Sequence, residues 1–271
     1  MINPKASNAR LPMSVPEGQL VDRNWLKKQG FTRPDIDYYL RSGALHAVSR
    51  GVYRKPGKPL KWEEFLYSLQ AMGYNVHCGG PQAIAEQGFS HFVSMSKVAE
   101  VHLYSPTQLP AWLQLWGPNL PASESSFYMV VHRQTWLKEL PQEFYTYRQY
   151  GHWEWQLRLA QIELAVFECL FEMQSETDFQ QMDRWFESLS SLSPAKLQQL
   201  LSLCPSFKTK RLFGWFAERH AHAWLKHLDW SSVDLGRGKR SVVKGGSYNK
   251  QWQITVPRKI EIPDGSEQSI F

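Results

Sequence analysis

The sequence predicts an α+β fold with three successive regions: a small N-terminal module, a mixed α/β middle, and a mainly helical C-terminal region that ends in a β-hairpin. Three observations support this. Helix caps and glycine stops recur near the N-terminus. Short extended runs dominate the middle, and apolar residues return at helical spacing towards the C-terminus. We expect the regions to cover residues 14–58, 59–151 and 152–262.

Start signals for two short helices lie in the first region. Asp22 is placed to cap a helix that ends at about Gln29, where a glycine follows. Thr32 and Asp35 have the spacing of a capping box for a second helix over residues 33–42, and Pro34 suits its first turn. Two helices joined by a tight turn that contains glycine are typical of a helix-turn-helix unit.

Two extended runs, residues 44–48 and 51–54, follow the second helix and predict a small hairpin with Arg50 at its tip. Together these elements predict a winged helix-turn-helix, whose second helix enters the DNA major groove. Arg41 is a candidate to read a guanine edge, and Tyr38 to contact a phosphate or a thymine methyl. The candidate DNA-binding residues are Lys27, Lys28, Thr32, Arg33, Asp37, Tyr38, Arg41, Arg50 and Arg54. The alternatives are a small α/β cap and a protein-binding winged helix.

Charge is distributed unevenly along the chain. Residues 1–58 contain 11 Lys and Arg against 4 Asp and Glu, and residues 208–258 contain 11 against 3. The intervening residues 59–207 contain 8 against 15, so two basic blocks flank an acidic middle. Phosphate attraction supplies most of the affinity of small DNA-binding modules, so the first block agrees with a DNA-binding role.

Targeting and cofactor signals are weak. The three cysteines form no C-x-x-C pair, which favours a reducing compartment. The N-terminus lacks the apolar core of a signal peptide, and no run approaches a membrane span, so we expect a cytoplasmic protein with no membrane contact. The histidines lack the spacing of metal ligands, so we expect no metal and no cofactor.

The middle region should contain a helix over residues 62–72, short elements at 74–77 and 81–87, and strands at 89–94, 100–104 and 127–132. In the C-terminal region the longest helix is expected from Trp155 to Met173. Another is expected from Lys208 to Leu228. A final strand at 252–257 should pair with residues 241–244 in a hairpin.

A second basic set begins in the first turn of the helix at Lys208, where positive charge opposes the helix dipole. A Gly-rich basic loop follows, but its spacing is not that of a phosphate-binding P-loop. We expect an exposed basic surface that meets an anion, an acidic partner or nucleic acid, and the alternative is a solvated helix end. Its candidate residues are Lys208, Lys210, Arg211, Arg237, Lys239 and Arg240.

With these motifs the chain resembles the AbiEi antitoxins of type IV toxin–antitoxin systems. The N-terminal resemblance rests on the helix-turn-helix and on residues 43–45 and 50–53. The C-terminal resemblance is more specific, because several motifs occur in order within about 50 residues. These motifs are residues 206–213, 224–225, 234–240, 245–246 and 254–257.

The resemblance implies a bacterial autorepressor and antitoxin without catalysis, acting in abortive infection. Its winged helix would bind operator inverted repeats, as a dimer or as two copies acting together. Its C-terminal part would counteract a nucleotidyltransferase-like toxin without requiring a stable complex. Two alternatives stay open: the C-terminal part is a nucleotide-dependent enzyme that modifies the toxin or a nucleic acid, or the protein is a ligand-sensing transcription factor.

Overall fold

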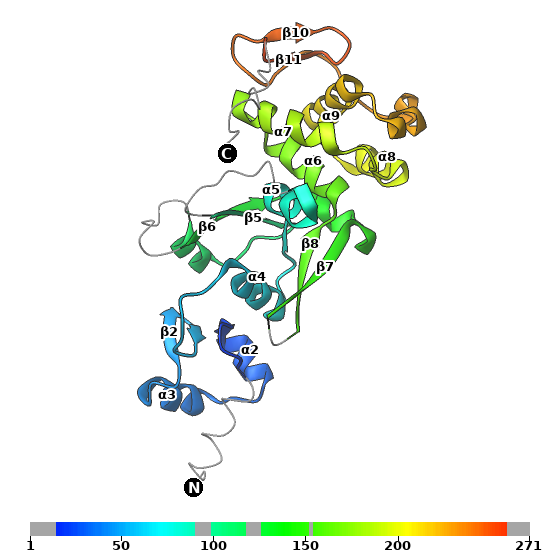
Figure 1. Ribbon diagram of the computed structural model, residues 1–271. Coiled ribbons are helices and arrows are strands. Elements are labelled where there is room, and N and C mark those ends of the chain that lie inside the picture. The colour runs from blue at the N-terminus through cyan, green and yellow to red at the C-terminus, as the bar shows by residue number, and fades with distance from the viewer. Residues whose placement is uncertain (1–14, 90–98, 118–125, 152–153, 259–271) are drawn as a thin grey trace, which may run out of the picture. The chain divides into compact units, whose positions relative to one another are not determined.

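The computed structural model describes residues 15–89, 99–117, 126–151 and 154–258 (Figure 1). These residues form two compact units. The first contains residues 15–78, 99–117, 126–138, 145–151 and 154–159. The second contains residues 79–89, 139–144 and 160–258. The chain passes between the units more than once, so the division differs from the three successive regions expected from the sequence.

The first unit begins with a helix-turn-helix and a three-stranded antiparallel sheet, in which β3 lies between β1 and β2. Its elements are β1 (Val21–Asp22), α2 (Arg23–Lys28), α3 (Arg33–Arg41), β2 (His46–Ser49) and β3 (Val52–Arg54). Both helices lie within one residue of their predicted ends. The β2–β3 hairpin forms the predicted wing.

Side-chain caps explain why both helices begin where they do. The Asp22 carboxylate accepts a 2.6 Å hydrogen bond from the backbone N–H of Trp25. At the start of α3, the Asp35 carboxylate accepts a 2.8 Å hydrogen bond from the backbone N–H of Thr32, and the Thr32 hydroxyl accepts one from Asp35. This reciprocal pair is the predicted capping box. Ile36 and Tyr39 are buried, so they form the inward face of α3.

A five-stranded mixed sheet forms the rest of the first unit, in the order β6-β5-β4-β8-β7. Its strands are β4 (His77–Cys78), β5 (Ala99–Ser105), β6 (Phe127–Arg133), β7 (Tyr145–Tyr150) and β8 (Trp155–Ala160). The short helical turns η3 (Ala111–Trp116) and η4 (Thr135–Glu139) accompany it, whereas η5 (Gln142–Phe144) belongs to the second unit. The predicted strands at 100–104 and 127–132 are confirmed as β5 and β6, whereas the one expected at 89–94 lies outside the described residues.

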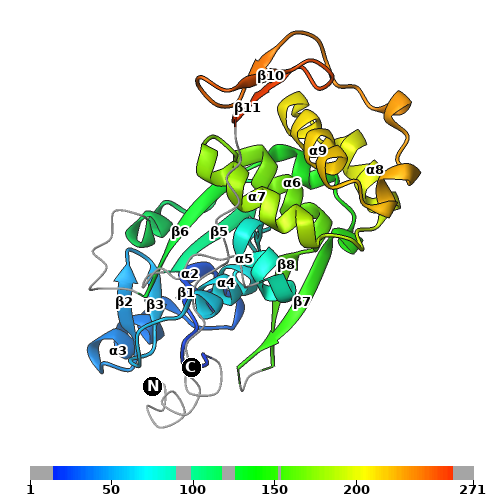
Figure 2. The ribbon, with the colours of Figure 1, turned by 45° about the horizontal axis from the view of Figure 1, so that its top comes forward.

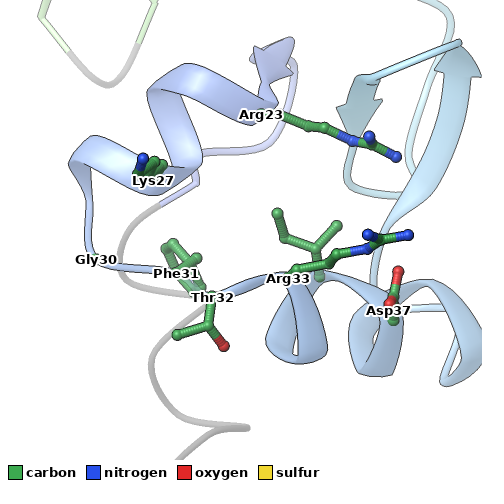
Figure 3. A pocket seen from close by; sticks show the side chains of 8 residues that line it. Arg23, Lys27, Gly30, Phe31, Thr32, Arg33 and Asp37 are labelled. Carbon is green, nitrogen blue, oxygen red and sulfur yellow. The ribbon is translucent and has the colours of Figure 1, made fainter.

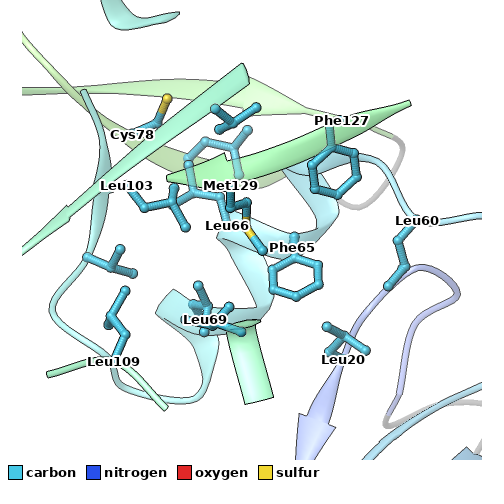
Figure 4. Packing of buried hydrophobic residues seen from close by; sticks show 14 of the residues in the cluster. Leu20, Leu60, Phe65, Leu66, Leu69, Cys78, Leu103, Leu109, Phe127 and Met129 are labelled. Carbon is cyan, nitrogen blue, oxygen red and sulfur yellow. The ribbon is translucent and has the colours of Figure 1, made fainter. Parts of the chain in front are cut away.

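The helix α4 (Trp62–Ala71) packs on this sheet through Phe65, Leu66 and Leu69, as its apolar spacing predicts (Figure 4). Leu20 and Leu60 join the same core from the N-terminal module. The backbone N–H of Leu20 also donates a 2.8 Å hydrogen bond to the hydroxyl of Ser68 on α4. The helix-turn-helix is therefore fastened to the sheet by shared apolar packing.

The helix expected from Trp155 to Met173 is wrong in its first third. Residues Trp155–Ala160 are the strand β8, and α6 (Ile162–Glu172) begins only after Gln161. Trp155, Leu157 and Leu159 are buried while Gln156 is exposed, which is the alternation of a strand. The uninterrupted apolar run that follows obscured this short alternating segment.

Helices make up most of the second unit. They are α5 (Gly80–Ile84), α6, α7 (Glu176–Ser188), α8 (Pro194–Leu203) and α9 (Phe207–His220), with short turns η1 (Ala85–Phe89), η6 (Ala223–His227) and η7 (Trp230–Ser232). Buried aromatic rings join α7 to α9: Phe186 stacks on Phe216 at a centroid distance of 5.1 Å and lies 5.9 Å from Phe213.

The helix expected over residues 208–228 ends earlier than predicted, at His220, and η6 follows it.

A three-stranded sheet closes the second unit, with β11 (Ile254–Val256) between β10 (Ser247–Asn249) and β9 (Arg240–Ser241). The antiparallel partner of β11 is β10, and β9 pairs with it in parallel. The predicted pairing of residues 252–257 with 241–244 as a hairpin is thus wrong, although a hairpin does end the region. The Asn249 side chain accepts a hydrogen bond from the backbone N–H of Trp252 and tightens the β10–β11 turn. Figure 2 shows this sheet beside α9.

Candidate nucleic-acid interface

The outward face of α3 carries charged side chains one turn apart. Arg33, Asp37 and Arg41 are exposed and recur at intervals of four residues, so they share one side of the helix. The Nε of Arg41 donates a 3.2 Å hydrogen bond to the carbonyl oxygen of Asp37, which directs the guanidinium along this face. Thr32 is exposed at its start, and Tyr38 is half-buried beside Tyr39, with ring centroids 5.5 Å apart.

A groove of about 480 Å³ lies between α2 and α3 (Figure 3). Lys27 lines it from α2, and Thr32, Arg33 and Asp37 line it from α3 and its cap. Lys28 is exposed beside Lys27 in the last turn of α2. Most charged groups around this groove are cationic, so its chemistry suits a phosphate backbone.

Arg23 is a groove residue that sequence reasoning missed. Its Nε donates a 2.8 Å hydrogen bond to the hydroxyl of Tyr53, which lies 30 residues further along the chain on β3. This hydrogen bond raises the pKa of Arg23, and the Asp37 carboxylate raises it further. The side chain is exposed but anchored, so it presents a cation in a fixed place at the groove. In the sequence, the only signal for Arg23 as a groove residue was the excess of basic residues in this stretch.

The wing holds the last two candidate DNA contacts in different ways. Arg50 is exposed at the turn between β2 and β3, where we predicted it. Arg54 is half-buried, and its guanidinium donates to the carbonyl oxygens of Lys55 and Lys58 at 3.1 and 2.5 Å. Arg54 therefore fastens the chain that leaves β3, whereas Arg50 is presented to solvent.

The structure separates the C-terminal basic residues that we expected on one exposed surface. Lys208 is half-buried, and its ammonium donates to the carbonyl oxygens of Phe171 and Met173 at 2.8 and 3.0 Å, at the C-terminal end of α6. A cation is favourable there because the last carbonyls of a helix carry partial negative charge. Burial lowers the pKa of Lys208, against the opposing effect of Glu172. The Lys208 charge is unfavourable at the N-terminus of α9, but it stabilises the C-terminal end of α6.

Lys210 and Arg211 are buried, with 5% and 2% of their surface exposed, so the prediction of an exposed basic surface is wrong for both. The Arg211 guanidinium donates hydrogen bonds to four carbonyl oxygens, those of Leu235, Gly236, Gly238 and Gln253, at 2.6 to 3.3 Å. Lys210 donates to the carbonyl oxygen of Asp234 at 3.2 Å. A buried charge is tolerated only when it is fully hydrogen-bonded, and these carbonyls satisfy that need.

The same hydrogen bonds show how the Gly-rich loop at residues 234–240 is oriented. The loop aims carbonyl oxygens at Arg211, whereas phosphate-binding loops aim backbone N–H groups at their ligand. Gly236 has φ +65°, and a Cβ there would lie 2.6 Å from the ring of Phe207. The remaining three predicted residues, Arg237, Lys239 and Arg240, are exposed on or next to this loop.

The described residues contain no group of three or more His, Cys, Asp or Glu side chains placed to hold a metal ion. Within the same residues, no helix has the length and apolar character needed to cross a membrane.

Two family models match successive parts of the chain. The first, described as "Transcriptional regulator, AbiEi antitoxin N-terminal domain", matches residues 5–95. The second, described as "Transcriptional regulator, AbiEi antitoxin, Type IV TA system", matches residues 98–257. The chain belongs to the AbiEi family of antitoxins and transcriptional regulators. The resemblance drawn from the sequence motifs is thereby confirmed, as is the α+β fold with an N-terminal domain of this family.

The AbiEi assignment agrees with a similarity in fold. The crystal structure of the RV2827C protein from Mycobacterium tuberculosis matches with a TM-score of 0.52 and 13% sequence identity. The match covers 93% of this chain and 89% of that one. At this identity the similarity supports the fold alone. No curated protein matches the AbiEi-family chain in sequence.

Proposed function

We propose that this AbiEi-family protein represses its own operon by inserting α3 into the major groove of operator DNA, and that its C-terminal part counteracts the cognate toxin. The observation that carries the DNA role is the exposed face of Arg33, Asp37 and Arg41 beside a cationic groove. A helix-turn-helix places the second helix in the major groove, while the first helix and the turn lie against phosphates. Arg23, Lys27 and Lys28 suit the phosphate role, and Arg50 suits a backbone contact from the wing.

Inverted repeats follow from this geometry if two copies bind. One α3 reads one half-site, so paired half-sites about one helical turn apart, roughly 34 Å, require two copies on the same face of the DNA. A footprint of the full chain on the DNA upstream of its own gene tests the proposal at two salt concentrations. Protection of paired repeats supports it. Protection without sequence preference that disappears at higher salt would contradict the proposal, because such binding comes from phosphate attraction alone.

The antitoxin role rests on the family assignment. The toxin would be nucleotidyltransferase-like, and neutralisation would not require a stable complex. Expression from an independent promoter separates the two roles: a variant with Arg23→Ala and Arg41→Ala should lose repression but still restore growth of cells that produce the toxin. Simultaneous loss of both activities, with an unchanged melting temperature, would contradict the assignment of the two roles to different parts of the chain.

A further inference from the structure

The outward face of the C-terminal sheet differs in chemistry from its inward face. Ile254 and Val256 on β11 are buried, so Thr255 between them lies on the opposite, outward face. Thr255 is directly paired with Tyr248 on β10 and with Ser241 on β9. Directly paired residues lie on the same side of a sheet, so Tyr248, Thr255 and Ser241 form one row across the outward face, with Thr255 in the middle. Tyr248 is 41% exposed, and it is one of four large hydrophobic residues of the described chain that are exposed.

Positive charge lies against this ring and continues along the neighbouring chain. The Lys239 ammonium lies 5.0 Å from the centroid of the Tyr248 ring, so a cation and an exposed aromatic ring are presented together. Lys250 is exposed two residues after Tyr248, in the turn that follows β10. Residues 235–258 contain six Lys and Arg and no Asp or Glu. The segment is therefore uniformly cationic, whereas residues 160–234 contain more acidic than basic side chains.

We propose that this outward face, made by Ser241, Tyr248 and Thr255 with Lys239 and Lys250 in the adjoining loop and turn, binds single-stranded RNA. An exposed ring on a small sheet stacks on an unpaired base, and flanking ammonium groups neutralise the phosphates on either side. The Ser241 and Thr255 hydroxyls are placed to hydrogen-bond ribose 2′-hydroxyls, which DNA lacks. Duplex DNA keeps its bases stacked inside the helix, so it leaves the Tyr248 ring unused.

This surface is independent of the proposed operator contact. It lies in the second unit, whereas α3 lies in the first, and the two surfaces share no residue. It also differs from the basic surface predicted from the sequence, because Lys208, Lys210 and Arg211 contribute hydrogen bonds inside the protein instead. Arg211 nevertheless has an indirect part, since it holds the loop that leads into Lys239 and β9.

The test is a titration of a fluorescent oligouridylate of about 12 nucleotides into the full chain, followed by anisotropy. Tyr248→Ala should weaken binding roughly tenfold, because it removes a base-stacking ring, and Tyr248→Phe should retain binding. Lys239→Gln should weaken binding and lower the slope of log affinity against log salt by about 0.7. Lys226→Gln, an exposed lysine outside the sheet, is the matched control and should bind as the unaltered protein does.

Three results would overturn the inference: no RNA binding by the unaltered protein, equal affinity of Tyr248→Ala, or equal affinity for oligodeoxyuridylate. Impaired toxin counteraction in Tyr248→Ala without any RNA binding would assign the face to a protein contact instead. The Arg41→Ala variant separates this inference from the operator proposal. It should bind the RNA with unchanged affinity even where operator binding is reduced.

Discussion

The Arg211 guanidinium donates a 2.6 Å hydrogen bond to the carbonyl oxygen of Gly238, joining the first turns of α9 to the loop that leads into the C-terminal sheet. Three more carbonyls share the same guanidinium. The loop carries the exposed Arg237 and Lys239, so a buried cation positions a surface of exposed cations. Repulsion between them is reduced because the carbonyl dipoles lie in between.

Arg211→Ala should therefore destabilise the protein strongly. The substitution leaves four carbonyls without their charged donor, two of them on the half-buried residues Leu235 and Gly236. Each carbonyl left unpaired in a buried place costs on the order of 1–3 kcal/mol, so these two alone predict a loss of about 2 kcal/mol or more. Urea denaturation measures the free energy of unfolding. Arg237→Ala, which removes an exposed arginine of the same loop, should change it by less than about 0.5 kcal/mol. Equal effects of the two substitutions would show that the hydrogen bonds of Arg211 do not stabilise the fold.

Gly214→Ala tests how closely α9 packs on the C-terminal sheet. A Cβ at Gly214 would lie 2.1 Å from the Trp252 ring, so the ring or the helix must move. Overpacking of this kind costs about 1–3 kcal/mol, which exceeds the roughly 1 kcal/mol that alanine gains over glycine within a helix. Thermal unfolding should show a lower midpoint. The cost should be smaller when Gly214→Ala is made in a Trp252→Leu background, since the clash is then relieved. Strict additivity of the two substitutions would contradict the contact.

Tyr53→Phe tests the anchoring of Arg23. The substitution removes the hydroxyl that accepts the Arg23 hydrogen bond but keeps the buried ring. Affinity for operator DNA should fall about twofold to fivefold, because a phosphate contact that was preorganised must now be ordered on binding. In an Arg23→Ala background the same substitution should have no further effect on affinity. A similar loss in both backgrounds would mean that Tyr53 acts through the fold and not through Arg23.

Asp183 should make the protein sensitive to acid. Burial alone would raise the pKa of this carboxyl, but hydrogen bonds from His220 and Arg219, at 2.7 Å each, outweigh burial and hold the pKa below its ordinary value. A carboxyl with a lowered folded-state pKa contributes stability that is fully present above its unfolded pKa, about 3.9. That contribution is lost as the pH falls through the lower folded-state value.

The free energy of unfolding should therefore drop more steeply below about pH 4 in the unaltered protein than in Asp183→Asn. At neutral pH, Asp183→Asn should be the less stable of the two, since the exposed Arg219 and the half-buried His220 lose their charged partner. Glu187→Gln, an exposed carboxyl on the same helix α7, serves as the control and should leave the pH profile unchanged. Parallel profiles of Asp183→Asn and the unaltered protein would contradict this account.

Local signals account for what the sequence predicted well. The caps Asp22 and Thr32 lie within three residues of their partners, so both helices of the N-terminal module were evident from short windows of sequence. The strand β6 was equally evident from its run of β-branched and aromatic residues. These elements needed no knowledge of distant contacts.

Distant contacts account for what it missed. The carbonyl partners of Arg211 lie 24 to 42 residues further along the chain, and Tyr53 lies 30 residues from Arg23. Within a short window, a buried structural arginine and an exposed binding arginine have the same charge pattern. Only the packing of α9 against the C-terminal loop shows that Arg211 is structural, and only the position of β3 shows that Arg23 is anchored at the groove.

The measurement that tests the central claim most directly is the affinity of Arg41→Ala for operator DNA and for a scrambled duplex, over a range of salt concentrations. Arg41 on the outward face of α3 should read a base edge, so its loss should cost about 1–3 kcal/mol on the operator and much less on the scrambled duplex. Arg50→Ala should weaken binding to both duplexes and flatten the salt dependence. Lys138→Ala, an exposed lysine on η4 outside the helix-turn-helix and the wing, should change neither. An unchanged ratio of operator to scrambled affinity in Arg41→Ala would contradict the claim that this face of α3 reads DNA.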